Sequence, residues 1–165
     1  VATRNAFKRA VVNAFAPSFD LGYQDGGGQL PTEADANDWL NARVDAELGN
    51  VEMLFQQARE LRKEDGFDGF TWATERADGY TGTLRSIYGA GKMWATKYKM
   101  LTWQYGETEH CDTCLSLNGQ RHQARWYINR DYIPRKPGAA MECGGFQCQC
   151  TLIDDEGNEF TIGAS

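Results

Sequence analysis

The cysteines are the residues of this chain whose type and spacing most clearly indicate chemistry. All five lie in the last third of the sequence. Cys111 and Cys114 form a C-x-x-C pair, and Cys143, Cys148 and Cys150 follow about thirty residues later. A C-x-x-C turn holds two thiolates close enough to bind one tetrahedral Zn²⁺, and a second cluster can supply the remaining ligands. The spacing therefore predicts a metal site.

Two other states of the cysteines stay open at this level. An odd number of clustered cysteines is also compatible with one or two disulfides, or with buried thiols that pack as small apolar side chains. As metal ligands we favour Cys111, Cys114 and Cys148, and Cys143 is a further candidate. Four protein ligands would leave no open coordination position, so such a site is structural rather than hydrolytic.

No residue pattern in the chain indicates catalysis. His110 adjoins Cys111, but adjacency in the sequence does not make a nucleophile and its base, and His122 is the only other histidine. The glycine run at residues 26–28 is not followed by Lys-Ser or Lys-Thr, so it is not a phosphate-binding loop. We therefore expect a protein that is not an enzyme.

Composition and charge exclude other classes of protein. The formal net charge of −6 argues against a dedicated nucleic-acid-binding module, which would be basic. Residues 71–105 are the exception, and their Lys92, Lys97 and Lys99 could meet packaged DNA or an acidic partner, or simply be solvated at a helix end. No apolar run reaches the roughly 20 residues of a membrane span, and no signal peptide is visible. Because Val1 stands where an initiator Met would, we expect a fragment or a processed chain.

Hydrophobic periodicity predicts three helices in the first hundred residues. The first covers about residues 4–16 and stops at Pro17, and the Gly- and Pro-containing segment 17–31 reads as a linker. A long second helix begins at a Thr32 cap and ends at Gly66. The third covers about 71–100, where its glycines predict either a break or the close approach of another backbone. A short turn between the long helices predicts an antiparallel hairpin.

From residue 101 onward the pattern changes to short strands and turns. Residues 101–105 predict a strand, Asn118-Gly119 predicts a hairpin turn, and 151–153 with 159–162 predict a terminal hairpin. The expected fold class is α+β, with an N-terminal helix and linker (1–31), a helical hairpin arm (32–100) and a small Cys-rich β module (101–165). A β module of about 60 residues buries little apolar area, so a structural zinc would supply folding free energy.

A family resemblance covers about residues 70–155. The residues that carry it are Trp103, His110-Cys111-x-x-Cys114, Leu117-x-Gly119, Pro134, Pro137 and Cys143-Gly-Gly-x-x-Cys148-x-Cys150-x-Leu152, preceded by Arg76, Tyr80, Leu84, Arg85, Ile87, Tyr88 and Gly91. This arrangement resembles the C-terminal domain of the phage Mu protein F-like minor head proteins, which act in head morphogenesis. The chain departs from the family at Gln149, where an Arg is usual, and at Gly145-Phe146, where many members have His-Pro.

The resemblance implies a function that composition alone does not. It implies a zinc-binding virion structural protein of a tailed bacteriophage or prophage, present in several copies near the portal in the capsid interior and in the host cytoplasm during assembly. Its expected partners are the portal protein and the major capsid protein, and genome ejection is a further expected role. It also implies Cys150 as the fourth metal ligand, because the family keeps Cys or His there. The alternatives are a fragment of a larger effector or toxin, and a zinc-ribbon-like nucleic-acid-binding module.

Overall fold

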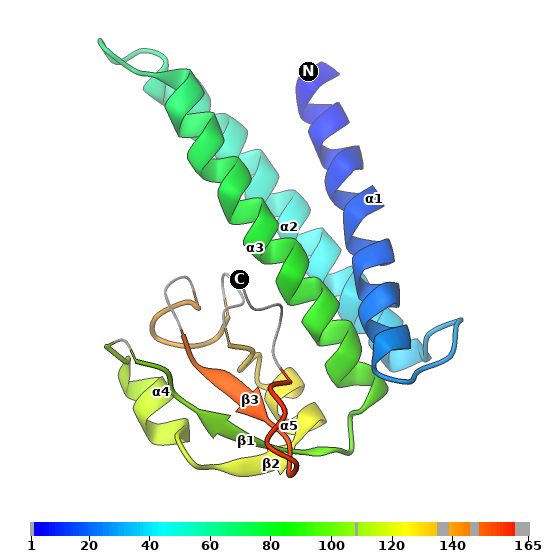
Figure 1. Ribbon diagram of the computed structural model, residues 1–165. Coiled ribbons are helices and arrows are strands. Elements are labelled where there is room, and N and C mark those ends of the chain that lie inside the picture. Colours follow the sequence, from blue (N-terminus) through cyan, green and yellow to red (C-terminus); the bar gives the residue numbers. More distant parts are fainter. Residues whose placement is uncertain (1, 108, 135–138, 146–148, 161–165) are drawn as a thin grey trace.

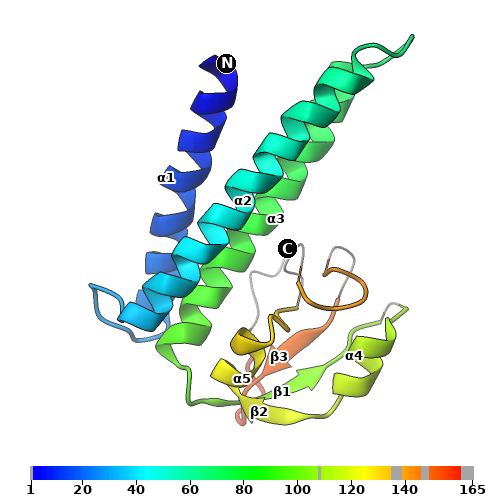
Figure 2. The same cartoon turned by 180° about the vertical axis from the view of Figure 1, so that it is seen from behind.

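The computed structural model combines a helical arm with a small antiparallel sheet, and it describes residues 2–107, 109–134, 139–145 and 149–160. The arm consists of α1 (Ala2–Asp25), α2 (Ala34–Leu61) and α3 (Gly69–Ala95). The sheet-bearing module contains β1 (Met100–Gln104), α4 (Asp112–Leu117), β2 (Arg121–Gln123), α5 (Ala124–Asn129) and β3 (Thr151–Ile153). The three long helices extend away from one side of the module (Figure 1, Figure 2). This architecture confirms the predicted α+β class.

The first helix is longer than the sequence predicts, because α1 continues through Pro17 to Asp25. Proline removes one intrahelical hydrogen bond and disfavours the preceding turn. Here Phe15, Phe19 and Tyr23, spaced four residues apart on one face, are all buried in the core. Their burial outweighs the local cost of the proline. The helix ends at the glycine run, where Gly27 has a φ of +87° and the Gly28 N–H donates to the Tyr23 carbonyl oxygen.

The three helices run down, up and down along the arm, so that α1 and α3 point the same way and α2 is antiparallel to both (Figure 1). The predicted helical hairpin of α2 and α3 is therefore present, with α1 added to it. On the α1 side, Phe7 faces Phe55 of α2, and Phe19 stacks on Trp39 at a centroid distance of 5.8 Å. The residue that precedes α2 is Glu33 rather than the predicted Thr32, and it makes no side-chain cap.

The closest helix packing in the arm is between α1 and α3, and glycines allow it. A Cβ atom on Gly91 would lie 2.1 Å from the Phe19 carbonyl oxygen, and one on Gly22 would lie 1.8 Å from the Tyr88 carbonyl oxygen. Real Cβ atoms do not approach backbone oxygens this closely, so each helix provides a glycine where the other presents its backbone. Of the two outcomes predicted for the α3 glycines, the close backbone approach is the one observed, and α3 does not break.

The sheet has the strand order β2-β1-β3, with both pairs antiparallel. Leu101 and Trp103 of the central strand are fully buried, and Trp103 pairs with Leu152 of β3. Tyr127 of α5 lies against Trp103, and its hydroxyl donates to the Gln120 carbonyl oxygen at 2.9 Å. Burial raises the pKa of Tyr127 to about 12, so the hydroxyl keeps the proton that it donates.

Two predicted turns of the module are only partly as expected. Asn118-Gly119 does not join two adjacent strands directly, because α4 lies between β1 and β2. Gly119, with a φ of +76°, instead reverses the chain after α4, and its N–H donates to the Trp103 carbonyl oxygen. The terminal hairpin is present through the bridge between Ile153 and Glu159. Its last predicted residues, 161 and 162, lie outside the described residues.

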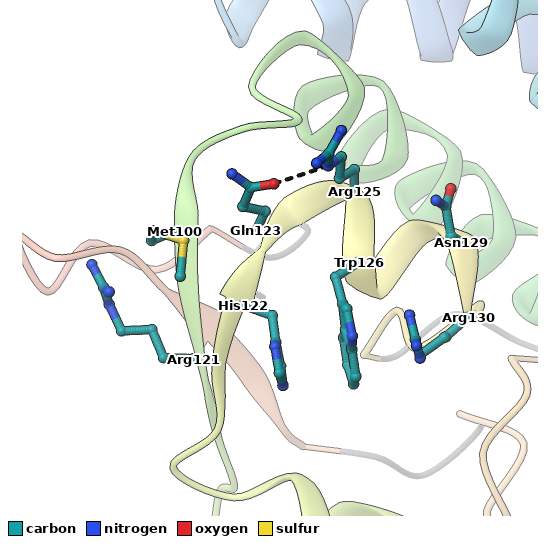
Figure 3. A pocket seen from close by; sticks show the side chains of 8 residues that line it. All are labelled: Met100, Arg121, His122, Gln123, Arg125, Trp126, Asn129 and Arg130. Atoms are coloured by element: carbon teal, nitrogen blue, oxygen red, sulfur yellow. Dashed lines mark hydrogen bonds between the residues drawn. The ribbon is translucent and has the colours of Figure 1, made fainter.

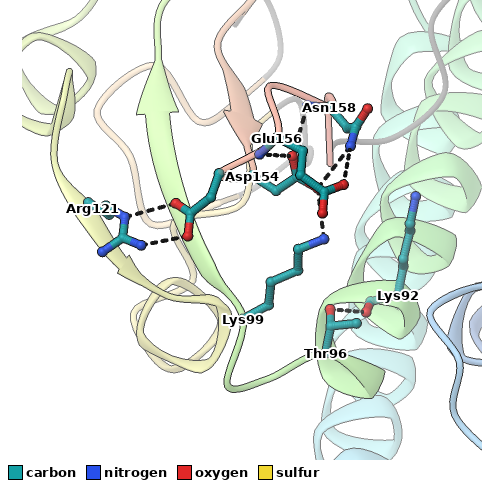
Figure 4. Close-up of polar contacts among 8 residues, drawn as sticks. Lys92, Thr96, Lys99, Arg121, Asp154, Glu156 and Asn158 are labelled. Atoms are coloured by element: carbon teal, nitrogen blue, oxygen red, sulfur yellow. Dashed lines mark hydrogen bonds and ion pairs between the residues drawn. The ribbon is translucent and has the colours of Figure 1, made fainter.

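A buried carboxylate fixes the turn of that hairpin to the end of the arm (Figure 4). The Asp154 side chain is 3% exposed and accepts a hydrogen bond from Lys99 Nζ at 2.7 Å. It also accepts from the N–H groups of Glu156 and Asn158. The ammonium group of Lys99 is the largest cause of a lowered Asp154 pKa; burial opposes it, and the Asn158 hydrogen bonds add to it. The ionised form of Asp154 is thus the form that the fold requires.

We expect the Asp154→Asn variant to lose part of the acid dependence of stability. A carboxyl group whose pKa is lowered on folding stabilises the protein above its unfolded pKa of about 4, and this stabilisation disappears as the pH falls below that value. Thermal unfolding between pH 7 and pH 3 should therefore show a smaller drop in Tm for Asp154→Asn than for the unaltered chain. Glu60→Gln, at an exposed surface pair with Lys63, is the matched control. An equal drop in Tm between pH 7 and pH 3 for all three proteins would contradict the stabilising role of ionised Asp154.

Candidate metal centre

Three cysteine sulfur atoms gather at one end of the module. The Sγ atoms of Cys111, Cys114 and Cys143 all lie within 4.8 Å of one another, and they form the candidate metal group found among the described residues. The Cys111 and Cys114 Sγ atoms are 3.4 Å apart, which is well beyond the S–S bond length of about 2.05 Å. These two residues are therefore thiols and not a disulfide in this structure.

The start of α4 positions the first two of these sulfurs. Cys111 is the residue before the helix, and its Sγ accepts from the Cys114 N–H at 3.5 Å. This capping contact turns both side chains of the C-x-x-C pair to the same side. Cys114 is 1% exposed and packs in the core, so the position of the C-x-x-C pair is fixed by the packing of α4.

Two hydrogen bonds across the chain bring Cys143 to the pair. The Asp112 N–H donates to Glu142 Oε2 at 3.0 Å, and the Glu142 N–H donates to Thr113 Oγ1 at 3.3 Å. After Cys143 the chain turns at Gly144 and Gly145, which have φ values of +58° and +75°. The segment that carries Cys143 is thus held against the start of α4 by backbone and side-chain contacts.

The geometry and the electrostatics of the three thiols suit a soft divalent metal. Zinc–sulfur bonds of about 2.3 Å in a tetrahedron place neighbouring sulfurs about 3.8 Å apart, close to the spacing found here. Burial disfavours ionisation of Cys111, but hydrogen bonds from the backbone and thiols of Cys114 and Cys143 outweigh it and lower the Cys111 pKa. A thiolate is the form that binds metal, so this environment favours coordination.

The other predicted ligands have different positions. Cys150 is fully buried and is not in the group of three; its Sγ lies 3.7 Å from His110 Nδ1. The other ring nitrogen of His110 is 3.0 Å from the Gly106 carbonyl oxygen, and the ring stacks on Tyr105. Because a carbonyl oxygen only accepts, Nε2 carries the proton and Nδ1 is left to face the Cys150 thiol. Cys148 lies outside the described residues.

The three lysines for which DNA, an acidic partner or simple solvation was expected, Lys92, Lys97 and Lys99, lie near the junction of arm and module. Lys97 forms an ion pair with Glu33, and this hydrogen bond is the largest cause of a raised Lys97 pKa. Lys99 holds Asp154, and Lys92 Nζ lies 5.0 Å from the centre of the Phe160 ring. Two of these charges are therefore already matched by carboxylates, which leaves less positive charge here than the sequence suggests.

Sequence reasoning missed the residues that assemble the cluster. Thr113 and Glu142 carry no recognisable motif, and only the fold reveals that they bridge the two cysteine segments.

Comparison with known proteins adds nothing to this geometry. No family model matches the chain, and neither does any curated protein or solved structure. Within the described residues, no helix is both long and apolar enough to cross a membrane.

Proposed function

We propose that the module binds one structural Zn²⁺ through Cys111, Cys114 and Cys143, with Cys148 or Cys150 as the fourth ligand. The observation that supports this proposal is the convergence of three thiols from segments about thirty residues apart in the sequence. Zinc would connect the start of α4 to the segment at 141–145 and stabilise a module that is too small for a large core of its own. With four protein ligands, the metal would have a folding role and no catalytic role.

We further propose that the chain is a minor head protein of a tailed bacteriophage or prophage, a virion structural component that acts in head morphogenesis. The proposal rests on the family resemblance of the cysteine pattern, which implies Cys150 as a ligand. Cys143, from the same later cysteine cluster, is the residue that lies beside the C-x-x-C pair, so the two cysteine segments do meet. The arm is also suited to assembly, because α2 carries half-buried and exposed apolar side chains such as Phe55 and Met53.

The same proposal specifies the setting of the protein. Several copies would lie inside the capsid near the portal, in contact with the portal protein or the major capsid protein and close to packaged DNA. A role in genome ejection follows from that position. During assembly the protein would be in the host cytoplasm.

The experiment is quantitative mass spectrometry of procapsids and filled heads purified from the phage or induced prophage that encodes the chain. We expect the protein in both particles at a fixed ratio to the portal protein. As a control on incorporation, a Cys114→Ser variant supplied in trans should enter particles less than Ser116→Ala, whose side chain is exposed on the same helix. Absence of the protein from both particles would end the virion proposal and leave the zinc proposal standing.

A further inference from the structure

A basic cleft lies on the module at the edge formed by β2 and α5, and the metal cluster does not contribute to it. Its volume is about 530 Å³, within the range of ligand-binding pockets. Figure 3 shows side chains from both elements around the same opening. The residues that matter for its chemistry are Arg121, His122, Gln123, Arg125, Trp126 and Arg130.

The cleft contains a preformed stack of flat side chains. The His122 and Trp126 rings are 3.7 Å apart at an angle of 11°, and the Arg130 guanidinium lies 4.2 Å from the centre of the Trp126 ring. Trp126 lies between these two partners (Figure 3). The rings of Tyr127 and Tyr132 pack against the Trp126 ring, at centroid distances of 5.1 and 5.9 Å, and fix its position. A planar aromatic ligand can therefore add to the end of a stack whose side chains are already ordered.

The charge of the cleft is positive in an otherwise acidic protein. Arg125 and Arg130 are exposed, and neither forms an ion pair within the part of the chain that the structure describes. The Arg125 guanidinium instead lies 5.1 Å from the Tyr98 ring centre, and its Nε–H donates to the Gln123 amide oxygen Oε1 at 2.9 Å. Arg121 is different, because it holds Asp155 through two hydrogen bonds of 2.6 and 3.0 Å. Two guanidinium groups are thus left for an anionic ligand.

We infer that this cleft binds single-stranded nucleic acid. Arginines bind phosphate oxygens with paired donors, and flat side chains stack on unpaired bases. In this arrangement phosphates contact Arg125 and Arg130, a base extends the stack that contains Trp126, and the Gln123 amide can both donate to and accept from a base edge. An acidic peptide would satisfy the arginines but would leave the stack unused, and a duplex hides its base faces. The inference is independent of the virion proposal.

The test is fluorescence anisotropy with a labelled oligothymidylate of about 12 nucleotides, a length suited to one small binding module. We expect Arg125→Gln/Arg130→Gln to weaken binding by at least about tenfold, because each arginine makes a charged hydrogen bond to phosphate. The slope of log affinity against log salt should become shallower by about 1.4, at about 0.7 per phosphate contact. Arg59→Gln/Lys63→Gln, in the last turn of α2 and just after it, makes the same change in net charge away from the cleft and should leave the affinity unchanged.

A second variant separates stacking from charge. Trp126→Leu should weaken oligothymidylate binding by about tenfold with the salt slope unchanged, because loss of the central ring leaves His122 and Arg130 without the partner that orders them for a stacked base. If this variant loses its fold by circular dichroism, the arginine variants alone decide. An oligouridylate of the same length distinguishes RNA from DNA as the natural ligand. Polyglutamate or a duplex that binds as tightly as the single strand, or arginine variants that bind normally, would overturn the inference.

Discussion

Replacing Gly91 with alanine is expected to lower the free energy of unfolding by about 3 kcal/mol, the upper part of the range for overpacking a well-packed core. The added Cβ would lie 2.1 Å from the Phe19 carbonyl oxygen, and a backbone atom inside a helix cannot move aside alone. The whole of α1 would have to shift away from α3, which would loosen the packing of Phe15, Phe19 and Met93 in the core. Gly22→Ala, opposite the Tyr88 carbonyl oxygen, should have a similar effect.

Gly49 provides the matched control for this prediction. It lies inside α2, and a Cβ atom there would meet nothing within 4 Å. Gly49→Ala should therefore stabilise the protein by about 0.5–1 kcal/mol, because alanine loses less conformational freedom in a helix. Urea unfolding, followed by circular dichroism at the helical band, compares Gly91→Ala and Gly49→Ala directly with the unaltered chain. If Gly91→Ala and Gly49→Ala unfold at the same urea concentration, the close contact between α1 and α3 is not as described.

The second large effect is expected at the cysteine cluster. Native mass spectrometry of the purified chain should find one zinc per chain, and a strong chelator or Cys143→Ser should remove it. Structural zinc supplies an apparent binding free energy of about 10–16 kcal/mol at neutral pH, so its loss should unfold the segment that the three thiols hold together. Hydrogen exchange should then become fast in β1 and β3, which contain Trp103 and Leu152, while α1 stays protected by its contacts with α3.

Ser116→Ala is the control for substitution near the cluster, because the Ser116 hydroxyl donates only to the Thr113 carbonyl oxygen at the surface of α4. It should keep the metal and the protected amides. Comparing Cys148→Ser with Cys150→Ser identifies the fourth ligand as the residue whose loss lowers the zinc content. An unaltered chain without metal, lighter by about two hydrogens for each cystine, would mean that the cysteines form disulfides instead.

The sequence was a good guide wherever a local pattern and the burial of a residue agree. The periodicity of apolar residues correctly predicted three helices in the first hundred residues, because a helix buries one face and its spacing records that face. The end of α1 was predicted wrongly at Pro17, since a local rule cannot weigh the burial of Phe19 and Tyr23 against α3. The approach of α1 to α3 could be suspected from the glycines, but their partners could not be named.

The cluster shows the same division between local and distant information. The C-x-x-C spacing identified Cys111 and Cys114 without help from the fold, because the ligand geometry of such a turn is local. The position of Cys143 depends on the hydrogen bonds of Glu142 with Asp112 and Thr113, which are about thirty residues away and belong to no motif. Likewise, the basic cleft combines β2 with α5. The spacing of four between Trp126 and Arg130 fits one face of a helix, but it does not indicate that His122 of β2 also stacks on the Trp126 ring.

The junction between α3 and β1 determines how force would pass through the molecule. Only residues 96–99 separate the helix from the central strand, and the N–H groups of Ala124 and Arg125 donate to the carbonyl oxygens of Lys99 and Lys97. Lys99 also holds Asp154, so the connection is anchored to both α5 and the terminal hairpin. A load applied at the far end of the arm would therefore be transmitted as torque to the middle of the sheet, because the connection offers no flexible hinge to absorb it.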